Sequence, residues 1–275
     1  MLGKLLKHEF KATARTMLPM FGVVVLLSVL ANLGFAQIAD SENGALDILF
    51  GLFIFAFFLG LFTMGVMAMV VMIQRFYKNV LGDEGYLTLT LPVNVHEIVW
   101  SKLIVSFVWF LVTGLIAMAA VFIAVFTLTY TELGEMFQNM PSFGEMMRMF
   151  FEETGVTPLQ LTGAIAQFAA MIILSSLTGC LHFYAAMALG HSFSNNKVLL
   201  SVVFFIAISF VFSFVSSLLG IFVEGLAMTV TVEAGSSVMT TLQELSLGSM
   251  IYTLIEGVIL YLLTTYCLKH RLNLS

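Results

Sequence analysis

A carboxylate inside an apolar stretch is the first residue of this sequence that could do chemistry. Glu256 lies within the apolar residues 249–268. A charged side chain is costly inside a membrane, and it is usually paired or functional there. Glu256 therefore predicts a proton or cation site, a contact for a transported substrate, or a structural hydrogen bond to another helix. His182 and Gln167, in residues 158–189, are weaker candidates for lining a cavity.

Familiar catalytic motifs are missing from the sequence. There is no G-x-x-x-x-G-K-[ST] phosphate loop and no H-E-x-x-H or G-x-S-x-G motif. Cys180 and Cys267 both lie in apolar stretches, which argues against a disulfide or a metal site. We expect a protein that is not an enzyme and that holds no metal or cofactor of its own.

The composition indicates a membrane protein. Of the 275 residues, 60% are hydrophobic and 10% are charged, with a mean hydropathy of +1.04, whereas soluble domains carry about 25% charged residues. Stretches of about 20 apolar residues are long enough to cross a bilayer. Six are predicted, at residues 18–38, 46–74, 100–129, 158–189, 198–223 and 249–268. The expected fold is a single all-α transmembrane domain over residues 1–275.

The basic residues predict the topology. Lys and Arg accumulate in cytoplasmic loops, and Arg148 is the one exception to a one-sided distribution. The residues on the common side are Lys4, Lys7, Lys11, Arg15, Arg75, Lys78, Lys102, Lys197, Lys269 and Arg271. Both termini are therefore expected in the cytoplasm, with outer loops at 131–157 and 224–248.

Residues 1–16 predict an amphipathic helix at the inner membrane interface. Lys4, Lys7, Lys11 and Arg15 recur at steps of three and four residues, which places them on one face toward anionic lipid headgroups. Pro19 is expected to break this helix from the first span, because proline is best tolerated in the first turn of a helix.

The outer loops and the aromatic residues give further expectations. A short amphipathic helix is predicted at 142–153, a strand or irregular structure at 229–232, and a helix start at Thr157-Pro158. The pairs Ser175/Gly179 and Ala186/Gly190 predict close helix packing. Aromatic residues of the second span are candidates for the substrate path together with His182 and Glu256. These aromatic residues are Phe55, Phe58 and Phe62.

The polar segment 76–102 is the longest loop on the basic side. It carries Asp83 and Glu84, then Pro92, which fixes a turn. A short helix is predicted from Val95 to Ser101. The residues expected to contact a cytoplasmic partner are Asp83, Glu84, Pro92, Val95, His96, Glu97, Ile98, Ser101 and Lys102.

This segment resembles the first cytoplasmic loop of type-two ATP-binding-cassette (ABC) exporter permeases, in particular small permeases of the Firmicutes type. The resemblance rests on Phe76-Tyr77-Lys78, the run Gly82–Leu87 (GDEGYL), Thr90–Val93 (TLPV), Ile98 and Ser101-Lys102. The order of spans is also similar, although the loop between the third and fourth spans is longer than in many relatives. The resemblance implies a bacterial cell-membrane permease that pairs with a second copy or a paralogue. Two cytoplasmic ABC ATPase subunits would bind ATP and Mg²⁺, and Val95–Ser101 would be the coupling helix.

The expected function is outward transport of an amphipathic substrate (a peptide, lipid or drug) by alternating access. Nucleic acid is not an expected partner. One alternative is an ion- or proton-coupled secondary carrier that uses Glu256. A membrane sensor or scaffold without transport activity is the other alternative.

Overall fold

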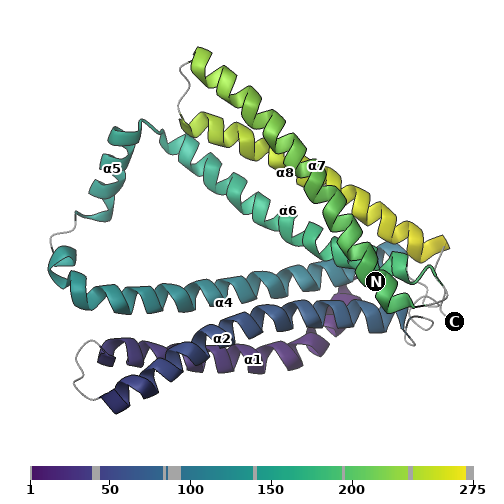
Figure 1. Ribbon diagram of the computed structural model, residues 1–275, viewed down its shortest axis with the longest axis horizontal. Helices are drawn as coiled ribbons and strands as arrows, with labels where there is room; N and C mark the ends of the chain where they lie inside the picture. Colours follow the sequence, from purple (N-terminus) through teal and green to yellow (C-terminus); the bar gives the residue numbers. More distant parts are fainter. Residues whose placement is uncertain are drawn as a thin grey trace. The chain divides into compact units, whose positions relative to one another are not determined.

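The computed structural model describes residues 2–38, 44–82, 85, 94–138, 141–193, 196–234 and 238–270, and every regular element in these ranges is a helix (Figure 1). The elements are α1 (Leu2–Ile38), α2 (Gly44–Phe76), the π-helix η1 (Tyr77–Leu81), α4 (Val95–Gln138), α5 (Phe143–Thr154), α6 (Pro158–Gly190), α7 (Lys197–Ala234) and α8 (Val238–His270). Within the described residues, six helices are long and apolar enough to cross a membrane. The predicted all-α multi-pass membrane fold is confirmed.

The chain divides into two compact units. The first comprises Met1–Gln74 and Ile104–Ser142, and the second comprises Arg75–Leu103 and Phe143–Ser275. The described flanks of the polar segment 76–102 therefore belong to the unit that contains α6, α7 and α8.

In the first unit, α1, α2 and most of α4 share one core. Met17, Phe21 and Val24 of α1 are buried with Met64 and Ala68 of α2. Trp109 of α4 completes this core, with ring centroids 6.2 Å from Phe10 and 5.9 Å from Phe21, and its indole Nε1 donates a hydrogen bond to Thr13 Oγ1 (2.7 Å).

Helix α1 runs without interruption through Pro19, so the predicted break between an interfacial helix and the first span is wrong. Met17 and Phe21 flank the proline and are buried, and packing of this kind stabilises a helix beyond its intrinsic propensity. Lys4, Lys7, Lys11 and Arg15 are all exposed, as expected for a basic face.

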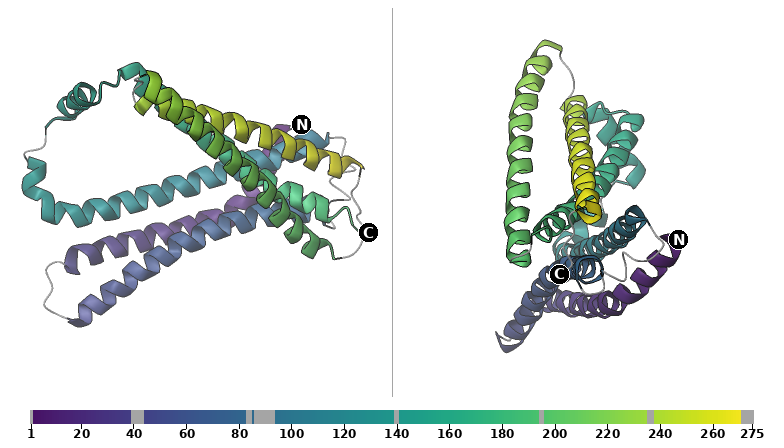
Figure 2. Two further views of the ribbon diagram at one scale, coloured as in Figure 1. Left: turned by 45° about the horizontal axis from the view of Figure 1, so that its top comes forward. Right: turned by 90° about the vertical axis from the view of Figure 1, so that its right-hand side faces the viewer.

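In the second unit, α6 packs against both α7 and α8 (Figure 2). Two glycines allow the close approaches. An added Cβ at Gly190 would lie 2.6 Å from the backbone nitrogen of Ser201 on α7, and one at Gly257 of α8 would lie 2.9 Å from Thr178 Oγ1 on α6. Gly179, by contrast, has nothing within 4 Å, so of the two predicted glycines only Gly190 serves a close contact.

Several predicted loops are helical. Residues 229–232 belong to α7, and the predicted outer loop 224–248 is mostly the end of α7 and the start of α8. The strand prediction is wrong because the β-branched residues there simply extend a long helix. The short helix predicted at 142–153 is confirmed as α5, and Arg148 Nε lies 3.4 Å from Glu152 Oε1 on it.

Thr157 caps α6 as predicted. Its hydroxyl accepts a hydrogen bond from the backbone N–H of Gln160, and the Gln160 side chain accepts one from the backbone N–H of Thr157. This reciprocal arrangement satisfies two donors that the first turn of a helix would otherwise leave free. Pro158 occupies the first turn, where its missing N–H is not needed.

Candidate functional site

Two polar stripes face each other across a groove between α7 and α8. On α7 the stripe is Ser213, Ser216, Ser217 and Gly220, and on α8 it is Ser249, Tyr252, Thr253 and Glu256. Each set recurs at i, i+3, i+4 and i+7, which is one face of an α-helix. The groove has a volume of about 810 Å³, within the range of about 300–1,000 Å³ that is typical of small-molecule sites.

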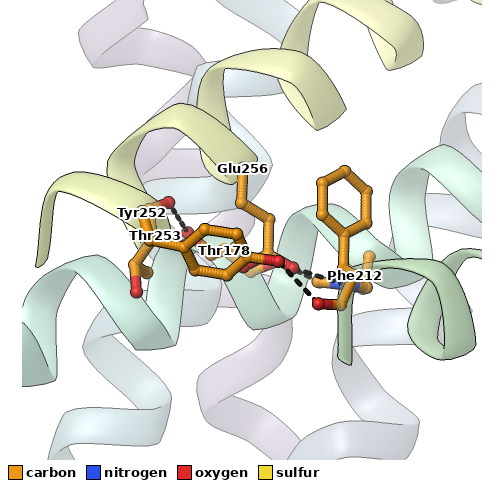
Figure 3. A network of polar contacts seen from close by, with 6 residues as sticks. Thr178, Phe212, Tyr252, Thr253 and Glu256 are labelled. Atoms are coloured by element: carbon orange, nitrogen blue, oxygen red, sulfur yellow. Dashed lines mark hydrogen bonds and ion pairs between the residues drawn. The ribbon is translucent and has the colours of Figure 1, made fainter. Parts of the chain in front are cut away.

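Glu256 lies in this groove with His182 beside it on α6. The carboxylate oxygen Oε1 of Glu256 is 3.1 Å from His182 Nε2, and both side chains are largely buried, at 11% and 16% exposure. Figure 3 shows Glu256 among Tyr252 and Thr253 of its own helix, Thr178 of α6 and Phe212 of α7. The structure thus brings together the two polar residues that the sequence assigned to a substrate path.

The hydrogen bond at Nδ1 of His182 determines which form of Nε2 faces Glu256. Its Nδ1 lies 3.0 Å from the Thr178 carbonyl oxygen, and a carbonyl can only accept, so Nδ1 carries a hydrogen. In a neutral imidazole with this tautomer, Nε2 is an acceptor and would face the Glu256 oxygen without a proton between them. A hydrogen bond across this contact needs a proton between the two atoms, which an imidazolium with a carboxylate or an imidazole with a carboxylic acid would supply. In both forms the pair has no net charge, which is the inexpensive state inside a membrane.

Other polar groups fix the helices around the pair. The Tyr252 hydroxyl donates to the Phe212 carbonyl of α7 (2.6 Å), and the Thr178 hydroxyl donates to the Thr253 carbonyl of α8 (3.3 Å). The Phe212 ring meets the His182 imidazole edge-on, with centroids 5.8 Å apart. Nearer one end of the helices, Gln167 donates to Ser246 (2.5 Å), so this third candidate links α6 to α8 rather than lining the groove.

The described flanks of the polar segment 76–102 pack on the same helices. Phe76 stacks on Tyr184 of α6, with centroids 4.0 Å apart and rings 8° from parallel, and Tyr77 meets His191 edge-on at 5.3 Å. At the other flank, His96 Nδ1 lies 2.6 Å from the Tyr261 hydroxyl of α8, whose ring also contacts Trp100. Both ends of the loop are thereby attached to the helices that carry the His182–Glu256 pair.

The predicted short coupling helix is not a separate element. Residues Val95–Ser101 form the first turns of α4, which continues to Gln138. The predicted boundary at Trp100 is therefore about five residues late. An apolar sequence continues smoothly into the next span, so the chain has no reason to break the helix there.

Three of the six described residues that were predicted to contact a partner are buried. Ile98, Ser101 and Lys102 are at most 4% exposed, and the Ser101 hydroxyl donates to the Ile98 carbonyl (2.7 Å). His96 is exposed, whereas Val95 and Glu97 are half-buried. A partner would therefore contact the exposed side chain of His96 and the segment that precedes Val95. Asp83, Glu84 and Pro92 lie outside the described residues.

The aromatic residues assigned to a substrate path do not line the groove. Phe55, Phe58 and Phe62 are 56–71% exposed on one face of α2, within the first unit. Their spacing of three and four residues gives α2 an apolar face of the kind that contacts lipid or another membrane protein.

His191 follows α6 just outside the membrane-spanning part. It is buried, its Nδ1 donates to the Met187 carbonyl (2.9 Å), and Lys197 is nearby. Burial lowers the pKa of His191 below its ordinary value, and repulsion from Lys197 lowers the pKa further, although the Met187 carbonyl opposes both. The imidazole therefore favours the neutral form at the turn between α6 and α7.

The groove has a sequence signal in the polar residues of the apolar stretch 198–223. Serine and glycine recur in the apolar stretch 198–223 at the helical spacing of 213, 216, 217 and 220. Such a stripe matches that of Ser249, Tyr252, Thr253 and Glu256. Comparing the polar faces of the two spans would have predicted their proximity.

Comparison with protein-family models, with curated proteins and with solved structures found no match to this chain. Within the described ranges, no three His, Cys, Asp or Glu side chains gather in a way that could hold a metal ion.

Proposed function

We propose that this chain is the transmembrane permease subunit of an ATP-driven ABC-type exporter in a bacterial cell membrane. It moves an amphipathic substrate outward by alternating access. The observation that carries this proposal is the attachment of both loop flanks to α6 and α8. Phe76 stacks on Tyr184 and His96 reaches Tyr261, so a displacement of the loop would act directly on the helices that form the polar groove.

The distances along the helices favour this coupling. Tyr184 lies two residues after His182 on α6, and Tyr261 lies less than two turns after Glu256 on α8. Packed helices transmit small shifts as rigid elements. Movement at the cytoplasmic ends of α6 and α8 would therefore reach the pair without an intervening flexible segment.

In this proposal the energy comes from partner proteins. Two cytoplasmic ABC ATPase subunits bind ATP and Mg²⁺, and a second permease copy or a paralogue completes the transporter. The loop carrying Asp83, Glu84 and Pro92 contacts the ATPase together with the exposed side chain of His96. This part of the proposal rests on the family resemblance of residues 76–102.

Co-purification with a candidate ABC ATPase tests the proposal. Glu84→Lys should weaken both complex formation and substrate-stimulated ATP hydrolysis, whereas Glu153→Lys, an equivalent charge reversal on an exposed residue of α5, should change neither. Tyr261→Phe removes only the hydroxyl that meets His96, so the complex should still form while stimulation falls. Normal complex formation and normal stimulation in Glu84→Lys would refute the assignment of the loop.

A secondary carrier is the second candidate, because the His182–Glu256 pair holds one exchangeable proton. Such a carrier would transport substrate without an ATPase and would depend on a proton or ion gradient. Transport in proteoliposomes that contain this chain alone, abolished by Glu256→Gln, would favour the carrier over the ABC permease.

A further inference from the structure

We propose that the groove between α7 and α8 binds an organic cation, an amphiphile with an ammonium group, and that Glu256 is its counter-charge. The proposal names a substrate class for the permease and so rests on the proposed function. It is carried by the charge, the size and the surroundings of the groove.

The charge of the groove favours a cation. Among the described residues that line it, Glu256 is the only carboxylate, and no Lys or Arg is present. The remaining polar groups are hydroxyls of serine, threonine and tyrosine, which are neutral and can accept hydrogen bonds from an ammonium. An anionic substrate would find no positive charge on these walls.

The size of the groove favours an organic molecule over a bare metal ion. About 810 Å³ is far more than an inorganic cation occupies, and such ions are held by about six converging oxygen ligands. The groove also has apolar walls, formed by Phe212, Leu219, Ile251 and Ile255. A ligand with an apolar body and one charged end matches this combination of surfaces.

When no ammonium is bound, His182 shares the proton that balances the charge of Glu256. It lies beside Glu256 but does not line the groove, because Thr178 holds its Nδ1 and Phe212 covers its ring. When an ammonium approaches Glu256, the proton shared with His182 leaves to solvent and the ammonium takes its place. Neutral His182 and an ammonium–carboxylate pair remain, so the net charge of the site is unchanged. The titratable groups around Glu256 are His182 on α6 and Tyr252 on α8, while the described part of α7 presents the Phe212 carbonyl and serines.

Binding to the purified chain, without any ATPase, tests the inference. The probe is dansylcadaverine, a fluorescent primary amine, and its N-acetyl derivative is the uncharged control. Anisotropy is measured in lipid nanodiscs, with protein-free nanodiscs subtracted. The amine should bind the wild-type protein at least tenfold more tightly than the N-acetyl derivative, because removing one partner of a buried charge pair costs at least a factor of ten.

Two variants, each of which replaces a glutamate by glutamine, complete the design. Glu256→Gln should weaken amine binding at least tenfold, whereas Glu244→Gln, the same change at an exposed position of α8, should leave it unchanged. Equal binding of the amine and its N-acetyl derivative to wild-type protein would overturn the inference even if Glu256→Gln failed to fold. That result would leave the ATPase partnership standing, whereas normal amine binding with no ATPase complex would overturn the proposed function alone.

Discussion

Replacing Gly190 by alanine should destabilise the protein, because α6 and α7 meet at this residue. A Cβ atom there would lie 2.1 Å from Ser201 Oγ, 2.6 Å from the Ser201 backbone nitrogen and 2.8 Å from the Lys197 carbonyl oxygen. Non-bonded carbon contacts are favourable at about 3.5–4.0 Å, so the start of α7 must move by about 1 Å. Overpacking of this kind costs roughly 1–3 kcal/mol. The gain in helix propensity, about 1 kcal/mol in a helix interior, is smaller at the last residue of α6.

The two cysteines provide the assay. Cys180 and Cys267 are buried thiols that form no disulfide, so a thiol-reactive fluorogenic dye reports unfolding in detergent. Each kcal/mol lowers Tm by roughly 2–4 °C in a chain of about this size, and we expect Gly190→Ala to lower Tm by about 2–12 °C. Gly163→Ala is the matched control on the same helix, because nothing lies within 4 Å of its added Cβ, and its Tm should be unchanged or higher.

A double variant distinguishes backbone crowding from a side-chain clash. Ser201→Ala removes the hydroxyl contact but leaves the contacts with the backbone nitrogen of Ser201 and the carbonyl of Lys197. Adding it to Gly190→Ala should therefore restore little of the lost stability. An unchanged Tm for Gly190→Ala, or full recovery in the double variant, would refute the close approach of the α6 and α7 backbones.

Three further predictions concern caps, protonation and the first unit. Thr157→Ala should cost about 0.5–2 kcal/mol by removing the cap of α6, seen as a lower Tm, whereas Thr157→Ser should retain the cap and the Tm. Because the pKa of His191 is lowered in the folded protein by burial and then by Lys197, the unfolded chain takes up a proton more readily; stability should be full above pH about 6.5 and fall as the pH drops below that value. Tryptophan fluorescence during unfolding at pH 5–8 measures this, and a pH dependence equally steep in His191→Gln would contradict it. Trp109→Phe should cost about 0.5–1.5 kcal/mol through the lost hydrogen bond to Thr13, and a double-mutant cycle with Thr13→Val that shows no coupling would argue against that bond.

The membrane fold was predictable because its signal is compositional. Six apolar stretches of sufficient length require six helices, whatever their packing. The boundaries were less predictable, since a helix that leaves the membrane can continue in water. Thus α7 reaches Ala234, where polar residues suggested a loop, and the helix predicted from Val95 continues into α4 without a break. The break predicted at Pro19 was wrong for a related reason. Packing of the buried Met17 and Phe21 outweighs the tendency of proline to interrupt a helix.

The site was predictable only in part. Glu256 and His182 stand out in apolar stretches, but nothing in the spacing of one helix indicates which face of another it meets. Their pairing depends on the close approach of α6 and α8, which Gly257 permits opposite Thr178. The serine stripe of α7 can be recognised in the sequence. It indicates a groove only when it is paired with the polar stripe of α8.

The length of α4 has a consequence for the lipid around it. Its 44 residues extend about 66 Å at 1.5 Å per residue, and the uncharged part, residues 103–131, extends about 43 Å. A hydrocarbon core is about 30 Å thick, and a tilt of about 40°, the upper end of the usual range, shortens that part to about 33 Å along the membrane normal. A thicker bilayer can therefore be matched by a smaller tilt, with no charged residue of α4 drawn into hydrocarbon. Helix α4 is built to tolerate membranes of different thickness, and only a membrane thinner than average would expose its apolar surface to water.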